Sequence, residues 1–73
     1  MKTNGKKVIF IDTELQLINC ICSKVTVEIY VGDELDYIGE ILSYTDNALE
    51  VNGGRYLIGN CEIWACGNYL KVE

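Results

Sequence analysis

A chain of 73 residues provides one domain with a small core, although 49% of its residues are hydrophobic. No window approaches the roughly 18 consecutive apolar residues of a membrane-spanning helix, and a net charge of −5 argues against a surface that attracts nucleic acid through its phosphates. We therefore predict one globular domain over residues 1–73, flexible in residues 1–6, and exclude a membrane protein.

The first predicted element is a strand over residues 7–12, KVIFID, which combines apolar and β-branched residues. Its apolar run is interrupted by Asp12 and Glu14, long before it could form the core of a secretion signal. We therefore expect the protein to be cytoplasmic, either in the producing cell or in a host cell.

The next segment, TELQLINCICSK, is ambiguous. Thr13 is a candidate helix N-cap, and Leu15, Ile18 and Cys22 have helical spacing, whereas the alternation of Leu15 and Leu17 also fits a strand. We favour one to three helical turns, with Leu15, Ile18 and Cys22 on one face, because the strand alternation breaks after Leu17.

From Val25 the hydrophobic period becomes two, which predicts a half-buried strand over residues 25–31. Val25, Val27, Ile29 and Val31 are expected on the buried face. Residues 32–36 are predicted to form an acidic turn.

A second strand is predicted over residues 37–44, with a bulge or bend at Gly39. Asp46 and Asn47 mark the next turn, and the sequence Asn52-Gly53-Gly54 indicates a tight hairpin. Further strands are expected at residues 49–51, 55–58, 61–65 and 69–72. These short strands, with no long helix among them, predict an all-β fold: a small curled antiparallel barrel, SH3-like, with a short N-terminal helix.

The order of residues between 25 and 65 resembles the Sm/LSm family, which includes Hfq-like proteins. Its first motif is matched by an alternating strand, two spaced glycines and an Asp-containing turn, and its second by an apolar stretch with further alternation. The matching positions are Val25, Val27, Ile29, Gly32, Gly39, Ile41, Asp46, Leu49, Leu57, Ile58, Gly59, Asn60, Ile63 and Ala65. Ile58 stands where the family has the arginine of an Arg-Gly pair.

This resemblance implies a ring in which edge strands pair between subunits, and it would suit a short helix before Val25. It also implies RNA binding, for which the basic N-terminal residues Lys6 and Lys7 and the loop near Asn47 are the candidates. The acidic balance and the absent Arg-Gly pair make RNA binding the alternative function here.

The four cysteines, Cys20, Cys22, Cys61 and Cys66, could hold a zinc ion, but their spacing is not that of two Cys-x-x-Cys knuckles. We interpret three of them as small core residues and place Cys66 in or near a turn. No cofactor is therefore expected, and zinc remains the alternative.

The absence of histidine, and of phosphate-loop or nucleophile motifs, predicts that the protein is not an enzyme. We expect a binding and assembly module that forms a homo-oligomer through strand edges and contacts a protein partner. The candidate contact residues are Tyr30, Tyr37, Asp33, Glu34 and Asp36. A second alternative is a small acidic inhibitor, of the mobile-element type, that occupies the basic groove of a nucleic-acid enzyme.

Overall fold

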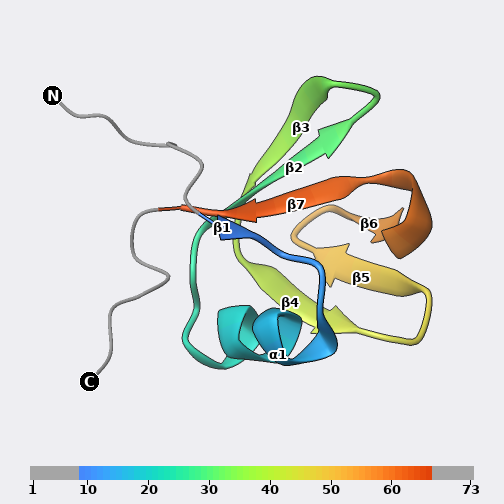
Figure 1. Ribbon diagram of the computed structural model, residues 1–73. Helices are drawn as coiled ribbons and strands as arrows, with labels where there is room; N and C mark the ends of the chain where they lie inside the picture. The colour runs from blue at the N-terminus through green and yellow to red at the C-terminus, as the bar shows by residue number, and fades with distance from the viewer. Residues whose placement is uncertain (1–8, 67–73) are drawn as a thin grey trace, which may run out of the picture.

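The computed structural model describes residues 9–66, and it confirms an all-β fold with one short N-terminal helix (Figure 1). The strands form two antiparallel sheets, and neither closes on itself. The segments predicted to be flexible, residues 1–6, and to form a last strand, residues 69–72, lie outside the described residues.

Sheet A has four strands in the order β1-β7-β2-β3. They are β1 (Ile9–Phe10), β2 (Val27–Val31), β3 (Glu34–Gly39) and β7 (Glu62–Ala65). The strand predicted over residues 7–12 is thus described as a two-residue strand, which pairs with β7. The backbone N–H of Ile11 extends this pairing by donating to the carbonyl of Ile63 at 2.9 Å.

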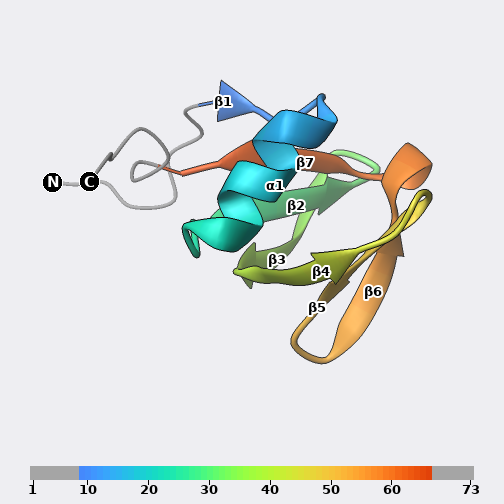
Figure 2. The ribbon, with the colours of Figure 1, turned by 90° about the horizontal axis from the view of Figure 1, so that it is seen from below.

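Sheet B has three strands in the order β4-β5-β6. They are β4 (Ile41–Tyr44), β5 (Ala48–Val51) and β6 (Gly54–Leu57). A short 3₁₀ turn, η1 (Ile58–Asn60), then returns the chain to β7 in sheet A. Figure 2 shows the β5–β6 hairpin on the side of the molecule away from β1 and β7.

The predicted helix is present as α1 (Glu14–Cys22), and it begins with a capping box. The backbone N–H of Gln16 donates to Thr13 Oγ1 at 3.2 Å, and the N–H of Thr13 donates to Gln16 Oε1 at 3.1 Å. These two bonds satisfy donors that the first turn of a helix leaves unpaired. Within residues 9–66, no helix has the length and apolar character needed to cross a membrane.

The buried face of α1 differs from the predicted one. Leu17 and Cys20 are buried, whereas Leu15 is 78% exposed and Cys22 is also exposed. The helix ends in a Schellman motif, in which the N–H of Val25 donates to the carbonyl of Cys20 at 2.9 Å and the N–H of Lys24 donates to that of Ile21 at 3.3 Å. Leu17 and Cys20, three residues apart, share the face that packs against the core.

The hairpin between β2 and β3 is tighter than the sequence predicted. Its loop is the pair Gly32 and Asp33, with φ angles of +59° and +72°, as a type I′ turn requires. Glu34, expected in the turn, is the first residue of β3. The predicted acidic turn of residues 32–36 is therefore a two-residue turn followed by an acidic strand.

The strand predicted over residues 37–44 is divided at Glu40 between the two sheets. Gly39 lies beneath the ring of Tyr37, and a Cβ atom at this position would be 2.8 Å from Tyr37 Cζ. The Tyr37 hydroxyl donates to the Glu40 carbonyl at 2.9 Å. The predicted bend at Gly39 thus transfers the chain from sheet A to sheet B.

The core lies between the two sheets and α1. Val25, Val27 and Ile29 are buried, as their alternation predicted, and Leu49 faces them from sheet B. Val31, expected on the same buried face, is exposed because it lies at the hairpin end, beyond the residues of β2 that pair with β7.

We expect Thr13→Ala to lower the free energy of unfolding by about 1 kcal/mol, since it removes one half of the capping box. Urea unfolding followed by circular dichroism measures this change. Thr13→Ser, which keeps the hydroxyl, is the matched control and should retain most of the stability. Equal stability of the alanine variant would show that the capping box does not contribute.

Candidate functional site

The outer face of sheet A carries a row of side chains that crosses all four strands. Phe10 pairs with Trp64, Trp64 with Glu28, and Glu28 with Ile38. Cross-strand partners in an antiparallel sheet project from the same face. This set, which we call the outer-face row, therefore brings together residues from β1, β7, β2 and β3.

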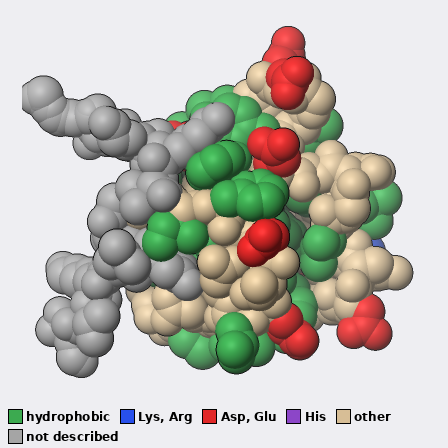
Figure 3. Space-filling view, viewed as in Figure 1, with side chains coloured by type: hydrophobic (Ala, Val, Ile, Leu, Met, Phe, Trp, Pro, Cys, Tyr) green, Lys and Arg blue, Asp and Glu red, His purple; other side chains and the backbone are tan. Residues whose placement is uncertain are grey.

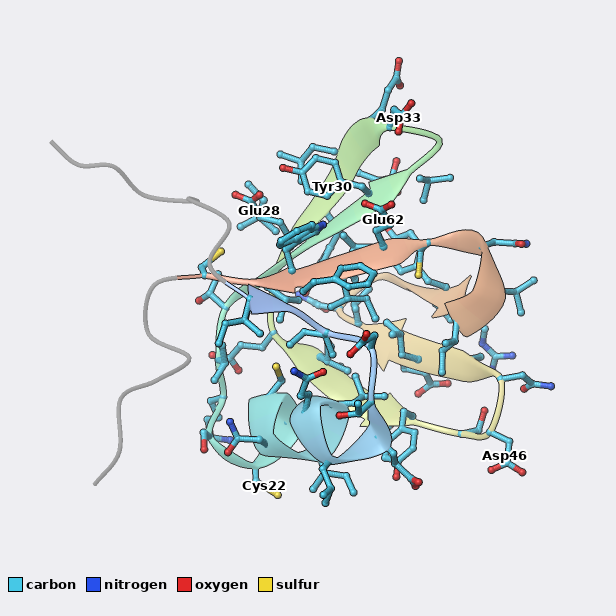
Figure 4. All side chains as sticks on the ribbon, in the orientation of Figure 1. Cys22, Glu28, Tyr30, Asp33, Asp46 and Glu62 are labelled. Carbon is cyan, nitrogen blue, oxygen red and sulfur yellow. The ribbon has the colours of Figure 1, made fainter. Side chains whose placement is uncertain are left out.

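A second, shorter row lies beside it and combines apolar and acidic character. Tyr30 on β2 pairs with Glu62 on β7 and with Leu35 on β3. Figure 4 shows Glu28, Tyr30 and Glu62 close together on this part of sheet A. The two rows together form the candidate site.

The aromatic end of the site is ordered by direct contacts. The rings of Phe10 and Trp64 lie 5.1 Å apart at a tilt of 49°, a spacing typical of favourable aromatic pairs. Trp64 Nε1 donates to Glu62 Oε1 at 3.3 Å. At the other end, Ile38 is 53% exposed and Leu35 is 45% exposed. The site thus presents apolar surface from both edges of the sheet.

Glu28 is the centre of the outer-face row, and it is only 3% exposed. The Tyr30 hydroxyl donates to Glu28 Oε1 at 2.6 Å. This hydrogen bond, followed by burial and the negative charge of Glu28, raises the pKa of Tyr30 to about 12. Among the described residues the salt bridge observed joins Arg55 to Glu50, so no described basic side chain neutralises Glu28.

Acidic side chains surround these rows. Asp33 lies at the tip of the β2–β3 hairpin, and Glu34 follows it on β3; both are exposed. Figure 3 shows hydrophobic side chains gathered on this face, with acidic side chains among them and at the hairpin tip. The surface therefore combines apolar contact area with negative charge.

The predicted contact residues are only partly brought together. Tyr30 lies on the outer face of sheet A and Asp33 at its hairpin tip, whereas Glu34, the cross-strand partner of Val31, projects from the opposite face. Tyr37 instead packs against the core, with its ring 6.3 Å from that of Tyr56. Asp36 is exposed, but its carboxylate accepts a hydrogen bond from the Tyr56 hydroxyl on β6. Tyr37 is therefore a structural residue in this fold.

The structure adds site residues that are not among the contact residues predicted from the sequence: Phe10, Glu28, Leu35, Ile38, Glu62 and Trp64. Alternation within a strand shows which residues share a face. It does not show which strands are neighbours, and the outer-face row exists only because β7 lies between β1 and β2.

Two further tyrosines join parts of the fold through carboxylates. Tyr44 on β4 donates to Glu14 Oε2 on α1 at 2.7 Å, and Tyr56 on β6 donates to Asp36 on β3. Each bond is the largest cause of a raised tyrosine pKa, which reaches about 12 for Tyr56. The helix and the two sheets are thus linked by neutral phenols that donate to carboxylates.

The cysteines do not come together. Cys20 and Cys22 lie on α1, whereas Cys61 and Cys66 flank β7, and residues 9–66 contain no group of three or more metal-ligating side chains placed to hold an ion. Burial raises the pKa of Cys20 to about 11, and burial also raises the pKa of Cys61 and Cys66. The geometry does not support the four-cysteine zinc alternative.

A hollow of about 270 Å³ lies where α1 begins, and it brings Asp12, Glu14 and Asp46 near one another. Glu14 is already engaged by Tyr44. These carboxylates are part of no metal-binding group among the described residues.

Of the RNA-binding candidates, only Asn47 lies among the described residues. Lys6 and Lys7 lie outside the described residues, and Asn47 is in the turn between β4 and β5. The Asn47 carbonyl accepts a hydrogen bond from the N–H of Ile58 at 2.9 Å, so its backbone helps to hold η1.

The fold and the site define a small all-β domain with an acidic, partly apolar outer sheet face. No family model, curated protein or solved structure matches the chain.

The Tyr56–Asp36 bond predicts a loss of stability at alkaline pH. The pKa of Tyr56 is raised in the folded state from 10.0 to about 12, so the bond contributes fully below pH 10 and its contribution is lost as the pH rises towards 12. We expect the free energy of unfolding, measured in urea, to fall less steeply over this range for Tyr56→Phe than for the unsubstituted protein.

A second variant is Asp36→Asn, which keeps an acceptor for the Tyr56 hydroxyl but removes the negative charge. It should show the same shallower alkaline slope as Tyr56→Phe. Identical slopes for Tyr56→Phe and the unsubstituted protein would contradict the proposed contribution of Asp36.

Proposed function

We propose that this protein is a non-catalytic binding module that contacts a basic protein partner through the outer face of sheet A. The observation that carries the proposal is the row from Phe10 to Ile38, which spans four strands and presents apolar surface at both edges. Large apolar patches with charged rims are typical of protein interaction sites.

Charge supports a basic partner. Residues 9–66 contain ten acidic side chains against two basic ones, Lys24 and Arg55, a formal charge of −8. Neither basic residue lies on a strand of sheet A. Such a field accelerates the approach of a positively charged partner and repels a polyanion.

The negative charge of residues 9–66 also distinguishes the two alternative functions, RNA binding and inhibition of a nucleic-acid enzyme. An RNA-binding ring would have to overcome repulsion from the described acidic surface. An inhibitor that occupies the basic groove of a nucleic-acid enzyme uses the proposed chemistry, and such an enzyme is one class of partner within this proposal.

Self-association through strand edges is the second part of the proposal, and we assign it to the edge of β6. The open side of β7 is covered by β1 through the pairs Ile9–Ala65 and Phe10–Trp64. Among the described strands β6 pairs only with β5, and it carries Leu57, which is 55% exposed. An open strand edge with an exposed leucine favours pairing with a second copy.

Ile38→Lys tests the partner surface. Placing a positive charge in the apolar row removes apolar contact and repels a basic partner, so it should weaken retention of the partner at least about tenfold, equivalent to ~1.4 kcal/mol. The measurement is capture, by the immobilised protein, of basic proteins from an extract of the cells that naturally make it, quantified by mass spectrometry. A folded variant, verified by its NMR spectrum, that captures the same proteins equally would overturn the proposal.

Leu15→Lys is the matched control, because Leu15 is, like Ile38, an exposed aliphatic residue of the same size but lies on α1. It should leave capture unchanged. Equal losses in the two variants would indicate nonspecific hydrophobic retention.

Leu57→Asp tests self-association at β6. We expect sedimentation analysis to show a smaller mass for this variant than for the unsubstituted protein, because the aspartate places charges beside each other in the paired edges. Leu15→Asp, which places the same charge on α1, serves as the control. A monomeric unsubstituted protein would contradict this part of the proposal and leave the partner surface standing.

A further inference from the structure

β3 is an edge strand of sheet A and the longest strand among the described residues, with six residues from Glu34 to Gly39. Within residues 9–66 it pairs with β2 and with no other strand. Figure 1 shows the β2–β3 hairpin projecting from the rest of the fold, with Asp33 at its tip in Figure 4. Backbone donors and acceptors along the outer edge of β3 are therefore available to another strand.

The other edges of the two sheets are less suited to a long added strand. β1 has two residues, and β4 lies beside α1 with Tyr44 bonded to Glu14. β6 has four residues and carries Arg55. β3 is the longest open edge, with six residues, and a bulge at Asp36 divides its ladder into two parts.

The charges on and beside β3 select what pairs with it. Asp33, Glu34, Asp36 and Glu40 lie within eight consecutive residues that contain no basic residue. Pairing two copies of β3 would place carboxylates opposite or diagonal to carboxylates, which destabilises a sheet. A second copy is therefore disfavoured at this edge, and a basic strand is favoured.

The apolar side chains on β3 define the rest of the pattern. Leu35 and Ile38 project from the outer face, since their cross-strand partners are Tyr30 and Glu28. A neighbouring strand places its own side chains about 5 Å from these residues on the same face. Apolar residues of an added strand would extend the candidate site by one strand.

We propose that an extended segment of the partner, with alternating basic and apolar residues, adds to the edge of β3 as a fifth strand of sheet A. This inference rests on the proposed function and specifies its mode of binding. Backbone hydrogen bonds supply affinity, and the carboxylates and apolar side chains supply selectivity.

The probe is an acetylated and amidated peptide of eight residues that alternates lysine and valine, titrated at low ionic strength into the full ¹⁵N-labelled chain. Chemical-shift changes and slower amide exchange are expected in residues 34–39. Two further peptides carry N-methyl groups on all the valines or on all the lysines. Only one of these sets can face β3, so one peptide should lose at least about tenfold in affinity and the other should bind like the parent.

Asp33→Asn and Asp46→Asn provide a matched pair of variants, because both aspartates are exposed turn residues and Figure 4 shows them far apart on the fold. Asp33→Asn should weaken peptide binding several-fold, and Asp46→Asn should have little effect. Asparagine is suited to the positive φ of residue 33, so the turn is expected to be kept.

The outcomes separate the two proposals. Equal binding of both methylated peptides, or no binding of the parent peptide, overturns strand addition at β3. If Ile38→Lys still weakens capture of the natural partner in that case, the outer face remains the binding surface. If the peptide does not bind as expected and the Ile38 variant also captures the partner normally, the proposed function is overturned as well.

Discussion

The bend at Gly39 and Glu40 is the constraint on which the rest of the structure depends. A straight strand from Glu34 to Tyr44 would remain in one sheet, and a single open sheet cannot enclose a core. The bend transfers the chain from sheet A to sheet B, so that Ile29 and Leu49 become fully buried in one core. β3, the edge strand of sheet A, ends at this bend, and the chain after it belongs to sheet B. The bend therefore both encloses the core and leaves the acidic edge of β3 open.

The local pattern of the sequence predicted much of the fold, but it did not predict the site. A period of two identified β2 and the burial of Val27 and Ile29, because it reports which residues share a face. The burial of Glu28 depends on β3 and β7 lying on either side of β2 with Ile38 and Trp64 opposite it. That register cannot be read from a single strand. The alternation within β2 predicts an exposed Glu28, but residues distant in the sequence enclose it.

Two predicted orientations, that of the Tyr37 side chain and that of the helix, were wrong for a related reason. Tyr37 was expected at the surface, but the register between β2 and β3 shifts next to Ile29 and Tyr30, and Tyr37 lies opposite the buried Ile29. The helix presents Leu17 and Cys20 to the core in place of the face predicted from Leu15, Ile18 and Cys22. In both cases the spacing of residues predicted the element but not its orientation. For Tyr37 the orientation depended on the bulge in the β2–β3 pair, and for the helix it depended on the core against which the helix packs.

Exposed apolar residues alone do not identify the binding surface. A hollow of about 320 Å³ between α1 and β4 is lined by Ile18, Ile21 and Leu42, and it provides apolar contact without a distinctive charge. The outer face of sheet A adds two properties that this hollow lacks: a buried carboxylate held by Tyr30 and an open strand edge among acidic residues. Carboxylates along an edge protect a small β protein from pairing with itself. The carboxylates along β3 act through their charge, so they repel a second copy of β3 and attract a basic strand. The groups that protect the edge from aggregation therefore also make it selective for a basic partner.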